Sequence, residues 1–234
     1  MINSIRKCLV YLFMISLFLP LIFSNIITIL LVIAFIISIF KSNISIHKGN
    51  LINLGLFASF FLIYVLGLFY SANLSEGLFI LEKKMSFIAI PLAFVGLSFS
   101  DKEVNRILRS YIIIASIVSI YLLIRILFKF LSIDSVSFAS ITNHELSSLI
   151  GFHATYLAMY LAFSILLSLH FYFIEQKRWI KYILIAVIFF TALIEFFLYA
   201  RIVLIALFII CGVYLFLEIL HHRRIQLIIT LSFL

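Results

Sequence analysis

Charged residues are scarce in this 234-residue sequence: they make up 11% of the chain, whereas 66% of the residues are apolar. A soluble globular domain has about 25% charged residues and about half apolar ones. A water-soluble fold of this length has too little interior to cover so much apolar surface. The composition therefore excludes a soluble domain of any size and predicts a protein whose main solvent is lipid.

Motifs for metals, nucleotides and disulfides are also missing. The two cysteines, Cys8 and Cys211, lie far apart in apolar runs, which excludes a CxxC pair or a zinc-ligand spacing. The sequence has no HExxH, no Walker loop, no GxGxxG and no GxSxG. We therefore predict no bound metal and no cofactor.

The N-terminus lacks the cleavage site of a signal peptide. Arg6 and Lys7 precede an apolar run that begins at Cys8, as in a signal peptide, but the segment Leu21–Asn25 has none of the small residues of an A-x-A pattern. The apolar run then continues. We predict an uncleaved first transmembrane helix.

Basic residues outnumber acidic ones by 17 to 9, which gives a formal charge of +8. They form short clusters between the apolar runs, as topogenic charges do. No basic patch interleaved with aromatic residues occurs outside the runs, so nucleic acid is excluded as a partner and the lipid bilayer is expected.

The apolar runs predict an all-α fold, a polytopic transmembrane helix bundle with about eight full spans and the start of a ninth. Two runs, residues 9–40 and 182–220, are longer than one crossing of a ~30 Å hydrocarbon core requires. We predict a tight hairpin in each run, near Pro20 to Asn25 and at Tyr199 to Arg201.

The other predicted spans are residues 51–70, 85–100, 111–131 and 150–173, with an interfacial helix in 71–84 and a polar loop at 221–224. The last apolar run, 225–234, is too short to cross the bilayer. We therefore expect residues 1–234 to be a single transmembrane domain that is the N-terminal part of a longer protein.

The orientation follows from the positive-inside rule. With the N-terminus in the cytoplasm, most lysines and arginines fall on the cytoplasmic side, including Arg6 and Lys7. This predicts a multi-pass protein of a bacterial inner membrane with a cytoplasmic N-terminus. The assignment depends on both hairpins, because removal of one would reverse every later loop.

A few basic residues remain on the predicted outer side: Lys83, Lys84, Arg125, Lys129 and Arg201. Charge at a membrane is costly and usually functional. Together these cations would suit a phosphate or pyrophosphate, which arginine binds bidentately and lysine binds as a point charge. The alternative for the lysines and Arg125 is that they extend to the interface as snorkelling side chains.

Arg201 lies at a predicted hairpin tip, where membrane topology requires no cation. The alternative is a structural pair with Glu195, the acid deep in the same run. Residues six apart do not share a face of a continuous helix. A bend at Tyr199–Ala200 would be needed to bring the two together.

Two histidines, His144 and His153, flank the start of the predicted 150–173 span, with Tyr156 one turn further on. A neutral histidine can act as a base near pH 7. The alternative is that each histidine is a polar anchor at the membrane interface.

Three segments, in this order, resemble the O-antigen ligase and O-antigen polymerase superfamily, particularly its Bacteroidetes-type members. They are Leu68–Asn73 leading through Leu81–Phe87 to Pro91, Gly151–Tyr160, and Leu198–Leu204. They are similar to the family's S-x-N loop with its K-L-S-x-x-x-x-P helix, its H-P-T-Y-x-x-x-Y segment and its S-R-x-x-L-L junction. Ala154 and Ala200 depart from the family's Pro and Ser without removing a charge or a nucleophile.

The resemblance covers nearly the whole chain as the N-terminal portion of the family architecture. It implies a periplasm-facing glycosyltransferase that moves a glycan from undecaprenyl diphosphate to an acceptor hydroxyl, with ligase and polymerase both open. The acceptor would be the lipid A core, a growing glycan or another hydroxyl compound.

The resemblance also implies that Arg201 holds the diphosphate and stabilises charge on the leaving group. We expect Lys84, Arg125 and Lys83 to assist, with His153, Tyr156 and Glu195 as further polar site residues. The family's catalytic histidine would lie beyond Leu234, so no catalytic residue is assigned. A chain complete at residue 234 is expected to be inactive.

Two other functions remain open. One is a membrane transporter or flippase of lipid-linked glycans, although the sequence shows no convincing internal repeat and its candidate charges cluster on one side. The other is a non-catalytic membrane scaffold, for which Arg201 would be dispensable.

Overall fold

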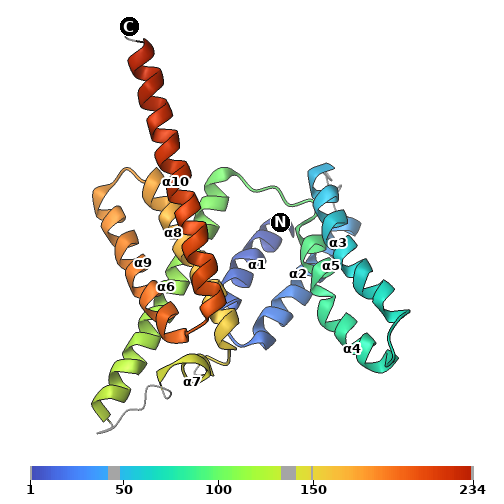
Figure 1. Ribbon diagram of the computed structural model, residues 1–234. Helices are drawn as coiled ribbons and strands as arrows, with labels where there is room; N and C mark the ends of the chain where they lie inside the picture. The colour runs from blue at the N-terminus through green and yellow to red at the C-terminus, as the bar shows by residue number, and fades with distance from the viewer. Residues whose placement is uncertain (1, 42–47, 133–140, 149, 233–234) are drawn as a thin grey trace. The chain divides into compact units, whose positions relative to one another are not determined.

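The computed structural model describes residues 2–41, 48–132, 141–148 and 150–232. Its secondary structure is 87% helix, and no strand occurs in these ranges. Figure 1 labels the helices, which are α1 (Ile2–Ser16), α2 (Leu21–Lys41), α3 (Lys48–Leu68), α4 (Leu74–Lys84), α5 (Ser86–Phe94), α6 (Asp101–Ser132), α7 (Asn143–Ser148), α8 (Ala154–Ile174), α9 (Arg178–Leu198) and α10 (Arg201–Ser232). The predicted all-α class is confirmed.

Within the described residues, 6 helices are long and apolar enough to cross a membrane, namely α2, α3, α6, α8, α9 and α10. Many apolar side chains on these helices are exposed, as expected where lipid covers them. The chain is therefore a multi-pass membrane protein, but the predicted eight spans are not confirmed.

The first and fourth predicted spans are not among these helices and are not confirmed. Helix α1 has 15 residues and α5 has 9, which gives lengths of about 22 Å and about 14 Å against a core of about 30 Å. Helix α5 contains Pro91, which has no N–H to continue the helical ladder. The chain leaves the helix at Val95, and Gly96 has a φ of 71°, so residues 85–100 do not form one span.

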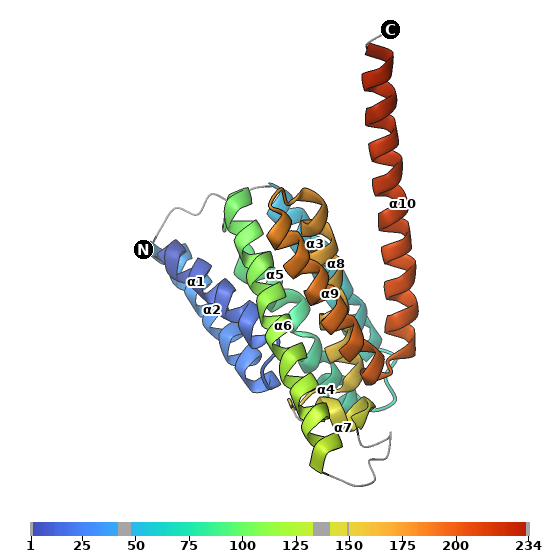
Figure 2. The same cartoon turned by 90° about the vertical axis from the view of Figure 1, so that its left-hand side faces the viewer.

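Both predicted breaks in the long apolar runs are confirmed. The chain turns between α1 and α2 just before Pro20, and α1 packs against α2. It turns again at Tyr199 and Ala200, between α9 and α10. The predicted loop at 221–224 and the separate ninth span are wrong, because α10 continues through both as one helix (Figure 2). No Gly or Pro interrupts α10 there, and arginine is a good helix former.

The chain forms two compact units, unit 1 (Met1–Ser110) and unit 2 (Tyr111–Leu234). In unit 1, α2 packs against α1 and α5, and α3 packs against α4 and α5. Its apolar core contains Val10, Phe13, Leu31, Ala93, Leu97 and Ile107. Helix α4 has no buried residue, and its N-cap is Asn73, whose side chain accepts a hydrogen bond from the Glu76 N–H.

Arg6 is fully buried in unit 1, although its sequence position predicted a topogenic surface charge. Its guanidinium donates to the carbonyl oxygens of Ala93 at 2.9 Å and Val95 at 2.6 Å, and to Ser38 Oγ at 3.3 Å. The last carbonyls of a helix have no partner within the helix. Arg6 therefore supplies the hydrogen bonds that the end of α5 lacks.

In unit 2, α8 packs against α7, α9 and α10 and carries more buried residues than any other described helix. The short connection at residues 175–177 makes α8 and α9 antiparallel neighbours. The Tyr111 hydroxyl of α6 donates to the Tyr160 carbonyl of α8 at 3.0 Å. Because α7 also contacts α9, the start of α8 and the end of α9 lie at one end of the unit, called the α7 end below (Figure 1).

Candidate functional site

The turn that holds Arg201 has an unusual backbone. Tyr199 ends α9 with φ 53° and ψ 30°, a left-handed conformation that costs a non-glycine residue roughly 1–2 kcal/mol. The Arg201 N–H donates to the Tyr199 carbonyl at 3.1 Å, and α10 begins at Arg201. The strained residue thus reverses the chain within two residues and leaves the arginine at the first position of a helix.

Tyr199 also positions the arginine side chain. Arg201 Nη2 donates to the Tyr199 hydroxyl at 2.8 Å, and the guanidinium carbon lies 4.7 Å from the centre of the Tyr199 ring. Both side chains are exposed. The guanidinium is held against its own turn and still offers further N–H groups to an anion.

Glu195 does not pair with Arg201. Its side chain is fully buried, and neither carboxylate oxygen has a hydrogen-bond partner, whereas Arg201 is exposed. The bend at Tyr199–Ala200 therefore does not form the structural ion pair that the sequence left open. Arg201 has no acidic partner among the described residues.

The histidines lie together at the α7 end. The ring centres of His144 and His153 are 4.2 Å apart in an edge-to-face arrangement, and those of His153 and Tyr156 are 5.8 Å apart. His153 Nδ1 accepts from the Thr155 N–H at 3.4 Å and caps α8, which leaves Nε2 to carry the ring proton. Sequence reasoning found both histidines but not their contact, which arises because α7 folds back against α8.

Several predicted site residues therefore belong to one end of unit 2. The contacts of α7 with α8 and α9 place the His144–His153 pair and the Tyr199–Arg201 turn at the α7 end. In Figures 1 and 2, the C-terminal end of α6 approaches the same end, and the exposed Arg125 lies in the last turns of α6. The polar α7 end is the candidate functional site.

Lys83 and Lys84 belong to unit 1, where their neighbours are aromatic. Lys83 Nζ lies 4.0 Å from the ring centre of Phe79, and Lys84 Nζ lies 5.4 Å from that of Tyr64 and 6.0 Å from that of Phe87. These are cation–π distances. A single pocket that unites these lysines with Arg201 stays a prediction.

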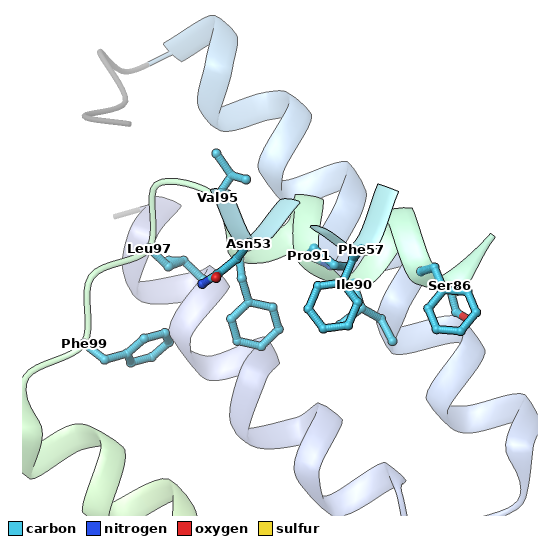
Figure 3. Close-up of a pocket in the computed structure, with 10 residues that line it drawn as sticks. Asn53, Phe57, Ser86, Ile90, Pro91, Val95, Leu97 and Phe99 are labelled. Atoms are coloured by element: carbon cyan, nitrogen blue, oxygen red, sulfur yellow. The ribbon is translucent and has the colours of Figure 1, made fainter. Parts of the chain in front are cut away.

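Unit 1 also contains a pocket of about 550 Å³ that sequence reasoning missed. It lies between α3 and α5, and its wall includes Asn53, Phe57, Phe87, Ile90, Pro91 and Phe99 (Figure 3). The wall is mainly apolar, and the polar side chains in it are Asn53 and Ser86. The feature of the sequence that could have indicated this pocket is Asn53, a polar residue inside an apolar run.

In the part of the chain that the structure describes, no group of three or more His, Cys, Asp or Glu side chains is placed to hold a metal ion. The fold and its charges define the class as a multi-pass, all-α membrane protein with an exposed arginine and a histidine pair at one end of unit 2. Comparison with protein-family models, curated proteins and solved structures finds no match to this chain.

Proposed function

We propose that this chain acts in glycan transfer from a lipid diphosphate in a bacterial inner membrane, as an O-antigen ligase or polymerase does. The observation that carries the proposal is Arg201, an exposed arginine positioned by Tyr199 and free of any acidic partner among the described residues. Its place at the start of α10 adds the positive end of a helix dipole. These are properties of an anion-binding group.

In the proposed reaction, an acceptor hydroxyl oxygen bonds to the anomeric carbon of the glycan. The bond from that carbon to the diphosphate oxygen breaks, its electron pair stays on the diphosphate, and a base takes the hydroxyl proton. Arg201 stabilises the charge that develops on the leaving diphosphate. His153 and Tyr156 contact each other at the same end and are suited to hydrogen-bond the glycan. No described residue is assigned as the base.

The proposed orientation keeps the N-terminus in the cytoplasm and turns the α7 end toward the periplasm. The distribution of lysine and arginine supports it. Cysteine accessibility at Ser148 and at Gln176, on opposite ends of α8, tests this directly. Labelling of Ser148→Cys alone by an impermeant thiol reagent in whole cells supports the orientation, and labelling of Gln176→Cys alone contradicts it.

The mechanism is tested by Arg201→Ala in an assay of glycan transfer from a labelled lipid-diphosphate donor. Loss of one such charge-stabilising donor lowers the turnover rate by about 100-fold or more. The matched control is Arg178→Ala, which removes an exposed arginine at the first position of α9, away from the α7 end. Equal activity of the two variants would remove Arg201 from the mechanism.

A second function, transport or flipping of lipid-linked glycans, is favoured by one observation. Glu195 and Thr191 lie one turn apart on α9, both are fully buried, and none of their side-chain oxygens has a hydrogen-bond partner. Ionisable groups inside a membrane bundle typically mark a transport or proton pathway. Loss of glycan flipping in proteoliposomes on Glu195→Gln, with Glu175→Gln unaffected, would favour the transporter over the transferase.

A further inference from the structure

We propose that unit 1 contains a binding site for an anionic phospholipid, with one acyl chain in the pocket along α5 and the phosphate at Lys84. This inference does not depend on the proposed function. It rests on the volume and lining of the pocket, on a cation at one end of it, and on the exposure of α3 and α4.

The volume fits a single hydrocarbon chain. A methylene group occupies about as much space as a water molecule in the liquid, about 30 Å³. The pocket of about 550 Å³ therefore accommodates roughly 18 methylene groups. This is the size of one phospholipid acyl chain and much less than a long polyprenyl chain.

The wall has the chemistry that such a chain requires. Phe57 comes from α3, Ile90 from α5, and Phe99 from the segment after α5 (Figure 3). Phe87 also comes from α5. None of these side chains offers a hydrogen bond. The α3 helix has no buried residue across its apolar window, so in a membrane this side of unit 1 meets lipid.

The cation stands at the α4 end of the pocket. Phe87 is part of the pocket wall, and its ring stacks on those of Phe60 and Tyr64 at centroid distances of 6.3 Å and 6.4 Å. Lys84 Nζ lies over this aromatic group, 6.0 Å from the Phe87 centre. An ammonium group beside the wall of an apolar pocket is complementary to a phosphate joined to an acyl chain.

The placement of α4 agrees with a headgroup at this point. Helix α4 has no buried residue and ends in Lys83 and Lys84, as a helix lying in the membrane interface does. Lys84 forms no ion pair with Glu82 or another acid among the described residues. The apolar α5 begins two residues after Lys84 and supplies much of the pocket wall.

The test uses the full chain, purified and reconstituted into nanodiscs, with a photoactivatable phosphatidylglycerol that carries a diazirine in one acyl chain. Labelled peptides are identified by mass spectrometry. We expect labelling of α3 and α5 at the pocket wall. Ile90→Trp fills the pocket and should abolish this labelling, whereas Ile63→Trp, on an exposed part of α3 outside the wall, should leave it unchanged.

The headgroup is tested separately. Lys84→Gln should weaken phosphatidylglycerol binding by up to about fivefold, the value of one exposed ion pair. The matched control is Lys102→Gln, which removes an exposed lysine at the start of α6. If Ile90→Trp does not fold, Asn53→Trp fills the pocket from the exposed α3 side instead.

Two results would overturn the proposal. One is equal labelling of the pocket wall in wild type and in the folded pocket-filling variant. The other is displacement of the phosphatidylglycerol probe by an equimolar polyprenyl phosphate, which would assign the pocket to a lipid-linked substrate. Absence of glycan transfer in wild-type protein that still takes up the phospholipid label would count against the proposed function alone.

Discussion

The guanidinium of Arg6 donates a hydrogen bond of 2.6 Å to the carbonyl oxygen of Val95, across 89 positions of the sequence. Val95 is the residue at which the chain leaves α5, so this bond closes the end of a short helix that contains Pro91. The same nitrogen also donates to Ala93, and Arg6 lies 5.2 Å from the Phe35 ring centre. One buried arginine therefore connects α1, α2 and α5.

Replacement of Arg6 should destabilise unit 1 strongly. Arg6→Met keeps the length of the side chain but leaves two buried carbonyls without a donor, at roughly 1–3 kcal/mol each. We expect a clear fall in Tm in detergent for Arg6→Met and a smaller fall for Arg6→Lys, which keeps one donor group. Lys102→Met is the exposed control, and a Tm of Arg6→Met equal to that of this control would contradict the structural role.

Replacement of Tyr199, whose backbone is left-handed, should affect stability and function in opposite directions. Tyr199→Gly removes the backbone strain, which favours the folded turn by roughly 1 kcal/mol. It also removes the ring and hydroxyl that hold Arg201. We expect Tm to stay equal or rise while glycan transfer falls, and Tyr199→Phe to lie between the two for transfer. An active Tyr199→Gly variant would show that Arg201 needs no positioning.

His153 should contribute to stability as the N-cap of α8. Its Nδ1 accepts from the Thr155 N–H, and an Ala in its place leaves that N–H without a partner at a cost of about 1 kcal/mol. We expect His153→Ala to lower Tm and His153→Asn to restore it, because asparagine is a strong N-cap. If His153→Asn also restores glycan transfer, His153 acts as a cap and not as a functional polar group.

Glu195 should be unnecessary for stability. Its buried carboxyl has no hydrogen-bond partner, so burial brings a cost that no contact offsets. Apolar replacements of buried charged groups are often neutral or stabilising. We expect Glu195→Met to keep or raise Tm, and to lower glycan flipping if the chain is a transporter. A large fall in Tm would instead show that the carboxyl has a structural role in the packing of α8 against α9.

Much of the fold is predictable because each membrane helix is marked by the length and hydropathy of its own segment of sequence. The apolar runs at 9–40 and 182–220 are each too long for one crossing of the membrane, so each must contain a turn. The first turn lies next to Pro20 and the second at Tyr199 and Ala200. Prediction from the sequence was wrong where a segment is apolar enough for a span but its helix is too short to cross the membrane. Residues 85–100 are apolar enough for a span, but α5 ends at Val95.

The candidate site also has features that the sequence predicts and features that depend on tertiary packing. Arg201, His153 and Tyr156 stand out as polar residues beside apolar runs, and their positions at helix ends follow from the turns. Two other features depend on how the helices of unit 2 pack on one another. One is the burial of Glu195 away from Arg201, and the other is the contact of His144 with His153. Side-chain direction at a turn is not encoded in hydropathy.

Composition and the length of the apolar runs were enough to establish a helical, multi-pass membrane protein, because transfer of apolar side chains into lipid is a local property of each segment. Tertiary packing alone decided that Arg6 binds the carbonyls of Ala93 and Val95 and that a pocket opens between α3 and α5. Those features join residues distant in sequence, and a buried donor takes whichever acceptor the packed helices bring to it.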